Sequence, residues 1–280
     1  MPDEQEKKGK AMSILLNRLL VILNDEKANS IYYHIAFTLL INFDQINTLS
    51  ISAVADLCAV SKSMISKFVR TAGFDDYKDF VAAAPFIENK YRNDLNYNNN
   101  IMGYLDNHSV DSYLNIIRED ICKFENSLDM KRIDELAQNL ISYDYVAAFG
   151  LLYSETAALD LQTKLAYNKK FIVTNLNDVK QEEYIMNATE KTLLIVFSNS
   201  GDYIEKNRMT EGKPKKSCFN KTKAKVVLIT ANEKMKDDPR VDLCIPIYYT
   251  SNIQTHSIIF QLLTDLITHR YRYFVRNQNQ

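Results

Sequence analysis

A serine-rich loop is the part of this sequence best suited to binding chemistry. Ser198, Asn199, Ser200 and Gly201 follow the continuous apolar run Thr192–Phe197 and precede a segment with helical spacing. Serine hydroxyls donate hydrogen bonds without carrying charge, and a glycine lets the backbone approach a ligand closely. The first amides of a helix lack intrahelical partners and attract anions. We therefore predict an anion-binding loop here.

A second loop has a similar composition. Gly150 follows the apolar run Tyr145–Phe149, and Ser154 is placed to cap a helix over Glu155–Tyr167. Because ligands of parallel α/β sheets collect at the carboxyl ends of strands, we expect both loops to lie at one site. A serine before a helix is also an ordinary cap, so either loop alone fits a ligand-free helix start equally well.

An earlier segment has the pattern of two short helices joined by a tight turn. The first helix is expected over Ile51–Cys58, with Val54, Ala55 and Leu57 facing inward. Ser61 is the expected N-cap of the second helix.

The second helix has a polar face suited to a DNA major groove. Residues 61–70 contain no acid, and serine hydroxyls and cationic side chains can meet phosphates and base edges. The candidate DNA-binding residues are Ser61, Lys62, Ser63, Ser66, Lys67 and Arg70. A helical hairpin with a solvated polar face is the alternative.

Composition excludes several other classes of site. The chain has 280 residues, 46% hydrophobic and 25% charged, with a formal net charge of -1, which fits two folded domains without a uniformly basic surface. The four cysteines and four histidines form no CxxC or HExxH pattern. We therefore predict no metal site, no cofactor and no catalytic residue. The N-terminus lacks a signal-peptide pattern and no apolar run is long enough to span a membrane, so a cytoplasmic location is expected.

The spacing of apolar residues predicts two domains of different class. An all-α helix-turn-helix domain is expected over 1–88, a linker over 89–106 and an α/β domain with a doubly wound parallel sheet over 107–280. Expected helices outside the two-helix segment are Met12–Leu23, Ile31–Asn42, Val110–Leu128, Ile133–Ile141, Glu155–Tyr167, Asp178–Asn187 and Ile253–Val275. Expected strands are Tyr145–Phe149, Phe171–Thr174, Thr192–Phe197, Lys225–Thr230 and Leu243–Ile247. Glu211–Lys223 is expected to be an exposed loop.

The two-helix segment resembles the N-terminal domain of the RpiR family of bacterial regulators. The resemblance lies in Ser61, Ser66 and the Gly-Phe pair at Gly73, followed by aromatic residues at 77 and 80. It departs at Met64, where threonine is usual, and at Lys67, where arginine is usual. Lysine cannot form the fixed bidentate fork that arginine makes to guanine, so the operator sequence is expected to differ.

Residues 107–280 resemble the SIS (sugar isomerase) domain, the usual partner of such a head. The match is the Ser-x-Ser-Gly loop with an acid behind it, here Glu205. Leu152 stands where a second glycine is usual, and Tyr203 where a threonine often helps to hold the phosphate. The resemblance implies a phosphosugar site at Gly150, Ser154, Ser198, Asn199, Ser200, Gly201, Tyr203 and Glu205.

These features together predict a transcription regulator of sugar metabolism or uptake genes. Its expected partners are a double-stranded DNA operator, a phosphosugar effector and a second copy of the chain, as a homodimer or a dimer of dimers. One alternative is a phosphosugar isomerase with an appended helical head, which would need a general base such as Glu205. The other is a regulator whose SIS-like domain only dimerises.

Overall fold

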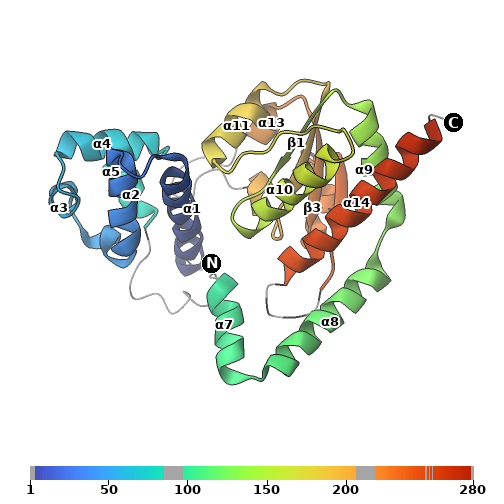
Figure 1. Cartoon of the computed structure of the whole chain (residues 1–280), viewed down its shortest axis with the longest axis horizontal. Helices are drawn as coiled ribbons and strands as arrows, with labels where there is room; N and C mark the ends of the chain where they lie inside the picture. The colour runs from blue at the N-terminus through green and yellow to red at the C-terminus, as the bar shows by residue number, and fades with distance from the viewer. Residues whose placement is uncertain are drawn as a thin grey trace. The chain divides into compact units, whose positions relative to one another are not determined.

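The computed structural model of the chain describes residues 4–84, 97–205, 218–249, 251, 253 and 255–278; of these, the side chains of 4–14, 97–100 and 205 are not described. The described residues form two compact units, one up to residue 84 and one from residue 97 onward. Figure 1 shows one unit made of helices and one in which helices surround a sheet.

Helices build the first unit, and four of them have a side-chain cap at the N-terminus. They are α1 (Glu4–Asp25), α2 (Ile31–Ile41), the 3-10 helix η1 (Phe43–Thr48), α3 (Ile51–Leu57), α4 (Lys62–Thr71) and α5 (Tyr77–Ala82). The side chains of Ser30, Ser50, Ser61 and Asp76 each accept a hydrogen bond from the backbone N–H three residues later. These caps satisfy amides that the helices leave free and so fix where α2, α3, α4 and α5 begin.

The inward-facing residues of α3 differ in one place from the prediction. Val54 and Ala55 are buried as expected, but Leu57 is 39% exposed and Cys58 is fully buried. The prediction for Leu57 is wrong because Cys58 lies four residues after Val54, on the same helical face, whereas Leu57 is turned away from that face. In addition, α1 begins at Glu4, well before the expected Met12.

A four-stranded parallel sheet forms the centre of the second unit. Its strands lie in the order β1 (Tyr145–Phe149), β2 (Thr192–Phe197), β3 (Lys225–Thr230), β4 (Leu243–Pro246). Phe149 pairs with Val196, so the loops after β1 and β2 leave the same edge of the sheet next to one another. The predicted parallel α/β fold is confirmed.

The predicted strand Phe171–Thr174 is wrong. The segment makes one isolated parallel bridge, in which Val173 N donates to Val146 O at 2.9 Å and Ala148 N donates to Val173 O at 2.8 Å. It lies beside β1, on the side away from β2. Among the described strands, none pairs with the other side of the segment, which makes only two ladder hydrogen bonds.

This placement creates a topological switch point. The chain runs from β1 to the Val173 segment on one side, and then to β2 on the other side. In such sheets the crevice at the carboxyl ends of the two strands, where the chain changes direction, is the usual ligand position. Here it lies between Gly150 and Ser198.

Helices cover both faces of the sheet (Figure 1). One face packs against α9 (Met130–Ser142), α10 (Tyr153–Ala166) and α14 (His256–Gln278), with Phe124 of α8 (Val110–Ser127) at its border. The other face packs against α11 (Asp178–Asn187), α12 (Asp202–Glu205), α13 (Cys218–Lys221) and the 3-10 helix η2 (Glu233–Asp237). Alternate strand residues point to the two faces, which explains why the strands are continuously apolar.

The remaining boundaries shift in small ways. Residues 97–106, expected in the linker, form most of α7 (Tyr97–Asn107). The expected loop at 211–223 lies outside the described residues up to 217, and Cys218–Lys221 is helical. The expected strand at Leu243 ends at Pro246, and the last helix begins at His256 rather than Ile253. The domain limits 1–88, 89–106 and 107–280 stay predictions.

Candidate functional site

The second helix of the two-helix segment, α4, separates an apolar face from a cationic one. Ile65, Phe68 and Val69 are buried, and Phe68 is in edge contact with Tyr32 at a centroid distance of 5.8 Å. Lys62, Ser63, Lys67 and Arg70 are exposed, and Ser66 is half-buried. The three cations make no ion pair within the described part of the chain, so their charge is available to an external anion.

The serine hydroxyls of α4 are engaged locally. Ser61 Oγ accepts from Met64 N at 3.2 Å and lies 2.8 Å from Ser63 Oγ, while Ser66 Oγ donates to Lys62 O at 3.1 Å. Ser61 therefore serves first as the helix cap. The two lysines and Arg70 are left as the exposed cationic side chains of this face.

Buried polar contacts hold α3 and α4 in a fixed arrangement. The Arg18 guanidinium lies 4.6 Å from the centre of the Phe74 ring and donates to Gly73 O at 2.9 Å. Tyr77 Oη donates to Leu49 O at 2.8 Å, just before α3. The sequence did not single out Arg18, because a lone arginine in a helical repeat has no pattern that distinguishes it from a surface residue.

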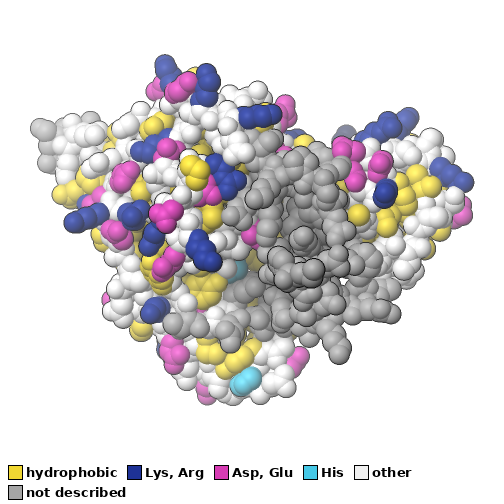
Figure 2. Space-filling model, turned by 180° about the vertical axis from the view of Figure 1, so that it is seen from behind, with side chains coloured by type: hydrophobic (Ala, Val, Ile, Leu, Met, Phe, Trp, Pro, Cys, Tyr) yellow, Lys and Arg dark blue, Asp and Glu magenta, His cyan; other side chains and the backbone are white. Residues whose placement is uncertain are grey.

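The visible surface of the α/β unit carries cationic and acidic side chains intermixed (Figure 2). This agrees with the formal net charge of -1. DNA affinity would therefore have to come from a local cationic face such as that of α4, and not from the overall field of the protein.

The loop after β2 is shaped by its own hydrogen bonds. Ser198 is buried, and its Oγ accepts from Tyr203 N at 3.2 Å, while Ser200 Oγ accepts from Asp202 N at 3.3 Å. Gly201 has φ +78°, a left-handed conformation that favours glycine. Asn232 Nδ2 donates to Ser200 O at 2.9 Å and holds the loop from the next loop of the sheet.

The loop after β1 requires a glycine at its start. A Cβ on Gly150 would lie 2.6 Å from the carbonyl carbon and oxygen of Ser154, so any other residue would force the first turn of α10 away. The side chain of Ser154 is largely buried, and its hydroxyl makes no hydrogen bond within the described residues. A nearly buried hydroxyl with unused donor capacity is the kind of group that a ligand can satisfy.

Leu152 holds this loop in a strained conformation. Its φ of 56° and ψ of -120° belong to a region that glycine adopts without cost and a residue with a Cβ does not. The backbone here thus has the geometry expected of the glycine that is usual in the SIS domain, with a leucine in its place. Such strain costs about 1–3 kcal/mol and persists only where the surroundings enforce it.

Tyr203 lies in the core below the loops and not on their surface. It is 5% exposed, its ring is in edge contact with Phe219 at 5.8 Å, and its hydroxyl donates to Gln181 Oε1 at 2.5 Å. Burial raises the pKa of Tyr203 well above its usual value, so the phenol stays neutral and remains a donor. Gln181 Nε2 in turn donates to Gly150 O at 3.0 Å and to Asn175 O.

An acid with a perturbed pKa adjoins the loops. Glu155 follows Ser154 in the first turn of α10, and its Oε2 is buried with no hydrogen-bond partner in the described chain. Burial, and secondly the charge of Asp178, raise the pKa of Glu155 to about 7. A carboxyl that is partly protonated near neutral pH repels a neighbouring anion less than an ionised one would.

Asn199 connects the loop after β2 to a distant helix. Its amide Nδ2 donates to Tyr249 Oη at 2.8 Å, just before the segment that leads into α14. In the same segment Ser251 N, Ser251 Oγ and Thr255 Oγ1 donate to the carboxylate of Asp120 at 3.1, 2.5 and 2.6 Å. Asp120 is 1% exposed and belongs to α8.

The structure thus brings most of the predicted anion-binding residues to one edge of the sheet. Gly150, Ser154 and the 198–201 loop lie at the switch point, Tyr203 lies beneath it, and the side chain of Glu205 is outside the described residues. Sequence reasoning missed the buried or supporting residues Gln181, Asn232, Tyr249, Asp120 and Glu155. Glu155 alone had a local signal, an acid directly after a predicted cap; the others act through contacts distant in sequence.

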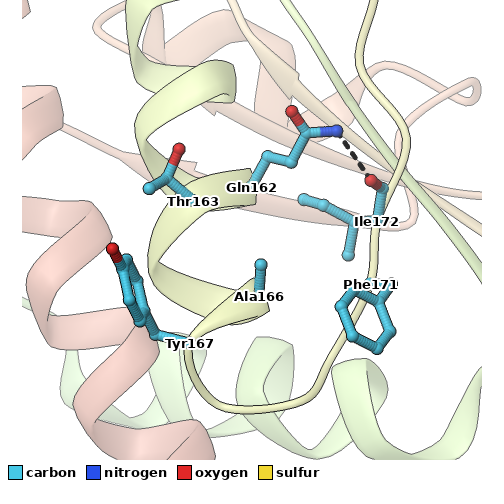
Figure 3. A pocket seen from close by; sticks show the side chains of 6 residues that line it. All are labelled: Gln162, Thr163, Ala166, Tyr167, Phe171 and Ile172. Carbon is cyan, nitrogen blue, oxygen red and sulfur yellow. Dashed lines mark hydrogen bonds between the residues drawn. The ribbon is translucent and has the colours of Figure 1, made fainter.

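A separate hollow lies at the other end of α10. It has a volume of about 470 Å³ and is lined by Gln162, Thr163, Ala166, Tyr167, Phe171 and Ile172 (Figure 3). Two of its polar side chains are already engaged, since Gln162 Nε2 donates to Ile172 O at 2.8 Å and Thr163 Oγ1 donates to Leu159 O. No cationic side chain is among the residues that line this hollow.

The described residues offer neither a metal site nor a membrane span. They contain no cluster of three or more histidine, cysteine, aspartate or glutamate side chains that could hold a metal ion. Among the described helices, none is both long and apolar enough to cross a membrane.

Comparison with known proteins identifies the helical unit. Residues 21–84 match the family model described as the helix-turn-helix domain of the rpiR family. A protein of Providencia stuartii, named as an uncharacterized HTH-type transcriptional regulator, is 25% identical over 260 residues, which cover 90% of this chain and 87% of that protein.

Solved structures similar to the chain include the following two. The NanR protein of Vibrio vulnificus, complexed with ManNAc-6P, covers 92% of this chain and 90% of its own at 14% identity and a TM-score of 0.45. The sugar isomerase domain of an RpiR transcription factor from Sphaerobacter thermophilus covers 59% and 97% at 13% identity and a TM-score of 0.43.

The family match confirms the predicted helix-turn-helix segment, since residues 21–84 include both α3 and α4.

Proposed function

We propose that this regulator binds DNA through α4 and is controlled by a phosphosugar held between the loops after β1 and β2. The observation that carries the effector site is the Ser154 hydroxyl, nearly buried and without a hydrogen bond in the described chain, at the switch point of the sheet. The DNA-binding part rests on Lys62, Lys67 and Arg70, which have no ion pair among the described residues and share one face of a helix whose other face is buried.

The chemistry of the loops favours a phosphate over other groups. The start of α10 offers the positive end of the helix dipole, and Ser154 adds a hydroxyl. Gly150 and Gly201 allow the backbone to come close to the ligand. A phosphate would be held by neutral donors, in the manner of other helix N-termini.

The same loops would connect the effector to α8. A ligand that contacts Asn199 would change the hydrogen bond between Asn199 and Tyr249. Tyr249 adjoins the segment that donates hydrogen bonds to Asp120 of α8, so a change there would reach α8. Since α8 follows α7, the first described element after the 85–96 segment, a shift of this clamp is a physical route toward the DNA-binding unit.

Two copies of the chain are part of the proposal. A single recognition helix gives modest affinity and specificity, whereas a dimer reads two half-sites at a fixed spacing. We place the association in residues 107–280, as the resemblance to the SIS domain implies, with 1–88 as the DNA-reading head.

Calorimetry with ManNAc-6P, ribose 5-phosphate and inorganic phosphate tests the effector site. Ser154→Ala should weaken binding about tenfold to a hundredfold, because a hydrogen bond to a charged group contributes roughly 1.5–3 kcal/mol. Thr156→Ala is the matched control, since Thr156 Oγ1 lies on the same helix but donates to Tyr153 O at 2.7 Å. Equal binding by parent and Ser154→Ala would refute this site, and aldose–ketose interconversion by the parent would instead favour the isomerase alternative.

A further inference from the structure

One buried amide joins the three loops that surround the switch point. Gln181 is fully buried; its Oε1 accepts from Tyr203 Oη, and its Nε2 donates to Gly150 O and Asn175 O. Gly150 belongs to the loop after β1, Asn175 to the loop after the Val173 segment, and Tyr203 to the start of α12 after β2. Both amide hydrogens are therefore committed to carbonyls of two different loops.

Two backbone carbonyls fix the orientation of this amide. The carbonyls of Gly150 and Asn175 can only accept, so the NH₂ group of Gln181 must face them, and its carbonyl oxygen then accepts from the neutral phenol of Tyr203. Tyr203 also reaches the loop after β2 directly, because its backbone N–H donates to Ser198 Oγ at 3.2 Å. Tyr203 and Gln181 thus form a relay from Ser198 to Gly150.

The relay holds the residue two positions before the strained one. Leu152, two positions after Gly150, holds a positive φ of 56° that it would leave if the loop were free to relax. A fixed Gly150 carbonyl removes much of that freedom. Ser154 follows in the first turn of α10, and the position of its hydroxyl decides how well an anion fits.

We propose that Tyr203 and Gln181 are positioning residues of the anion site, which hold the loop after β1 in its strained, binding-competent conformation without contacting the ligand. The proposal rests on the proposed phosphosugar site. The threonine that is usual in the SIS domain at this position implies direct binding of the phosphate. We assign Tyr203 a different role, because the Tyr203 hydroxyl is buried against Gln181.

Calorimetry on the full chain tests the proposal, with ManNAc-6P, ribose 5-phosphate and inorganic phosphate as probes. Tyr203→Phe keeps the ring on Phe219 and removes only the hydroxyl, and it should weaken binding of any probe that the parent binds by about tenfold. The matched control is Tyr184→Phe; Tyr184 packs on Phe149 in the same core, and its hydroxyl makes no hydrogen bond in the described chain. This control should bind as the parent does.

A rescue experiment separates positioning from general destabilisation. Leu152→Gly removes the strain, so the loop no longer needs the relay, and the double variant Leu152→Gly with Tyr203→Phe should recover most of the lost affinity. Thermal melting of each unliganded variant shows whether affinity and stability change together. Affinity that recovers without recovery of the melting temperature supports positioning.

The outcomes that would overturn the proposal are distinct. If the parent binds none of the probes, the proposed effector site fails and the positioning role fails with it. If the parent binds but Tyr203→Phe binds equally well, the effector site stands and the positioning role is wrong. If Tyr203→Phe loses affinity and Leu152→Gly does not restore it, the relay does not act through the strained loop.

Discussion

Removing the two exposed lysines of α4 should weaken DNA binding by an amount that can be read from its salt dependence. Lys62 and Lys67 lie on the exposed face of the helix, and neither makes an ion pair in the described chain. If each contacts one phosphate, the double variant Lys62→Ala with Lys67→Ala should lower the slope of log K against log salt by about 1.8, at roughly 0.9 per phosphate.

The assay is a fluorescence-anisotropy titration over salt on a fragment selected from a random DNA library. The parent's affinity should fall about twelvefold more than the variant's between 50 and 200 mM salt, as a slope difference near 1.8 requires. Both lysines are exposed, so the unfolding free energy should change by less than about 0.5 kcal/mol. Lys27→Ala, in the turn between α1 and α2, is the surface control. An unchanged slope in a folded double variant would refute the docking of α4 on DNA.

Three further predictions concern the α/β unit. Gly150→Ala should destabilise the unit by about 1–3 kcal/mol and abolish phosphate binding in calorimetry, because its Cβ would meet backbone atoms of Ser154 at 2.6 Å; retained binding would contradict the loop geometry. Glu155 has a folded-state pKa of about 7, above its unfolded value, so the stability it contributes should be lost as pH rises from about 4.5 through 7. Melting temperatures from pH 5 to 8 should then fall less for Glu155→Gln than for the parent, and parallel curves would argue against the raised pKa. Residues 107–280 alone should sediment as a dimer; a monomeric fragment would contradict the proposed association.

Elements with strong local signals could be predicted to the residue. The strands β2 and β3 match their predicted bounds because a continuous apolar run marks each of them, and the helix α11 matches its predicted bounds as well. Ser61 likewise fixed the start of α4, since its side chain makes the predicted cap. In these cases tertiary contacts reinforce the local preference.

Elements that depend on distant contacts could not be predicted. Phe171–Thr174 has a strand-like composition, but it lies at the edge of the sheet and only Val173 finds partners among the described strands. Leu57 and Cys58 are both apolar, and only the packing of α3 against its neighbours decides that Cys58 is buried.

The residues of the candidate site also divide into those with a local sequence signal and those that depend on distant contacts. Glycines and serines at the ends of strands marked the anion loops in the sequence, because those residue types have few other reasons to occur there together. Gln181 and Asp120 are polar residues within ordinary amphipathic helices, 31 and 131 positions from Gly150 and Ser251 respectively. Only the fold brings each of them to its partner.

The central claim is that one chain links phosphosugar binding to DNA binding, and a reciprocal titration tests it most directly. DNA affinity of the full-length protein is measured with and without the phosphosugar that calorimetry identifies, and phosphosugar affinity is measured with and without the DNA. The account predicts that both affinities change by the same factor, at least about fivefold, since coupling between two sites is reciprocal. Binding of both ligands with neither affinity altered by the other would contradict it.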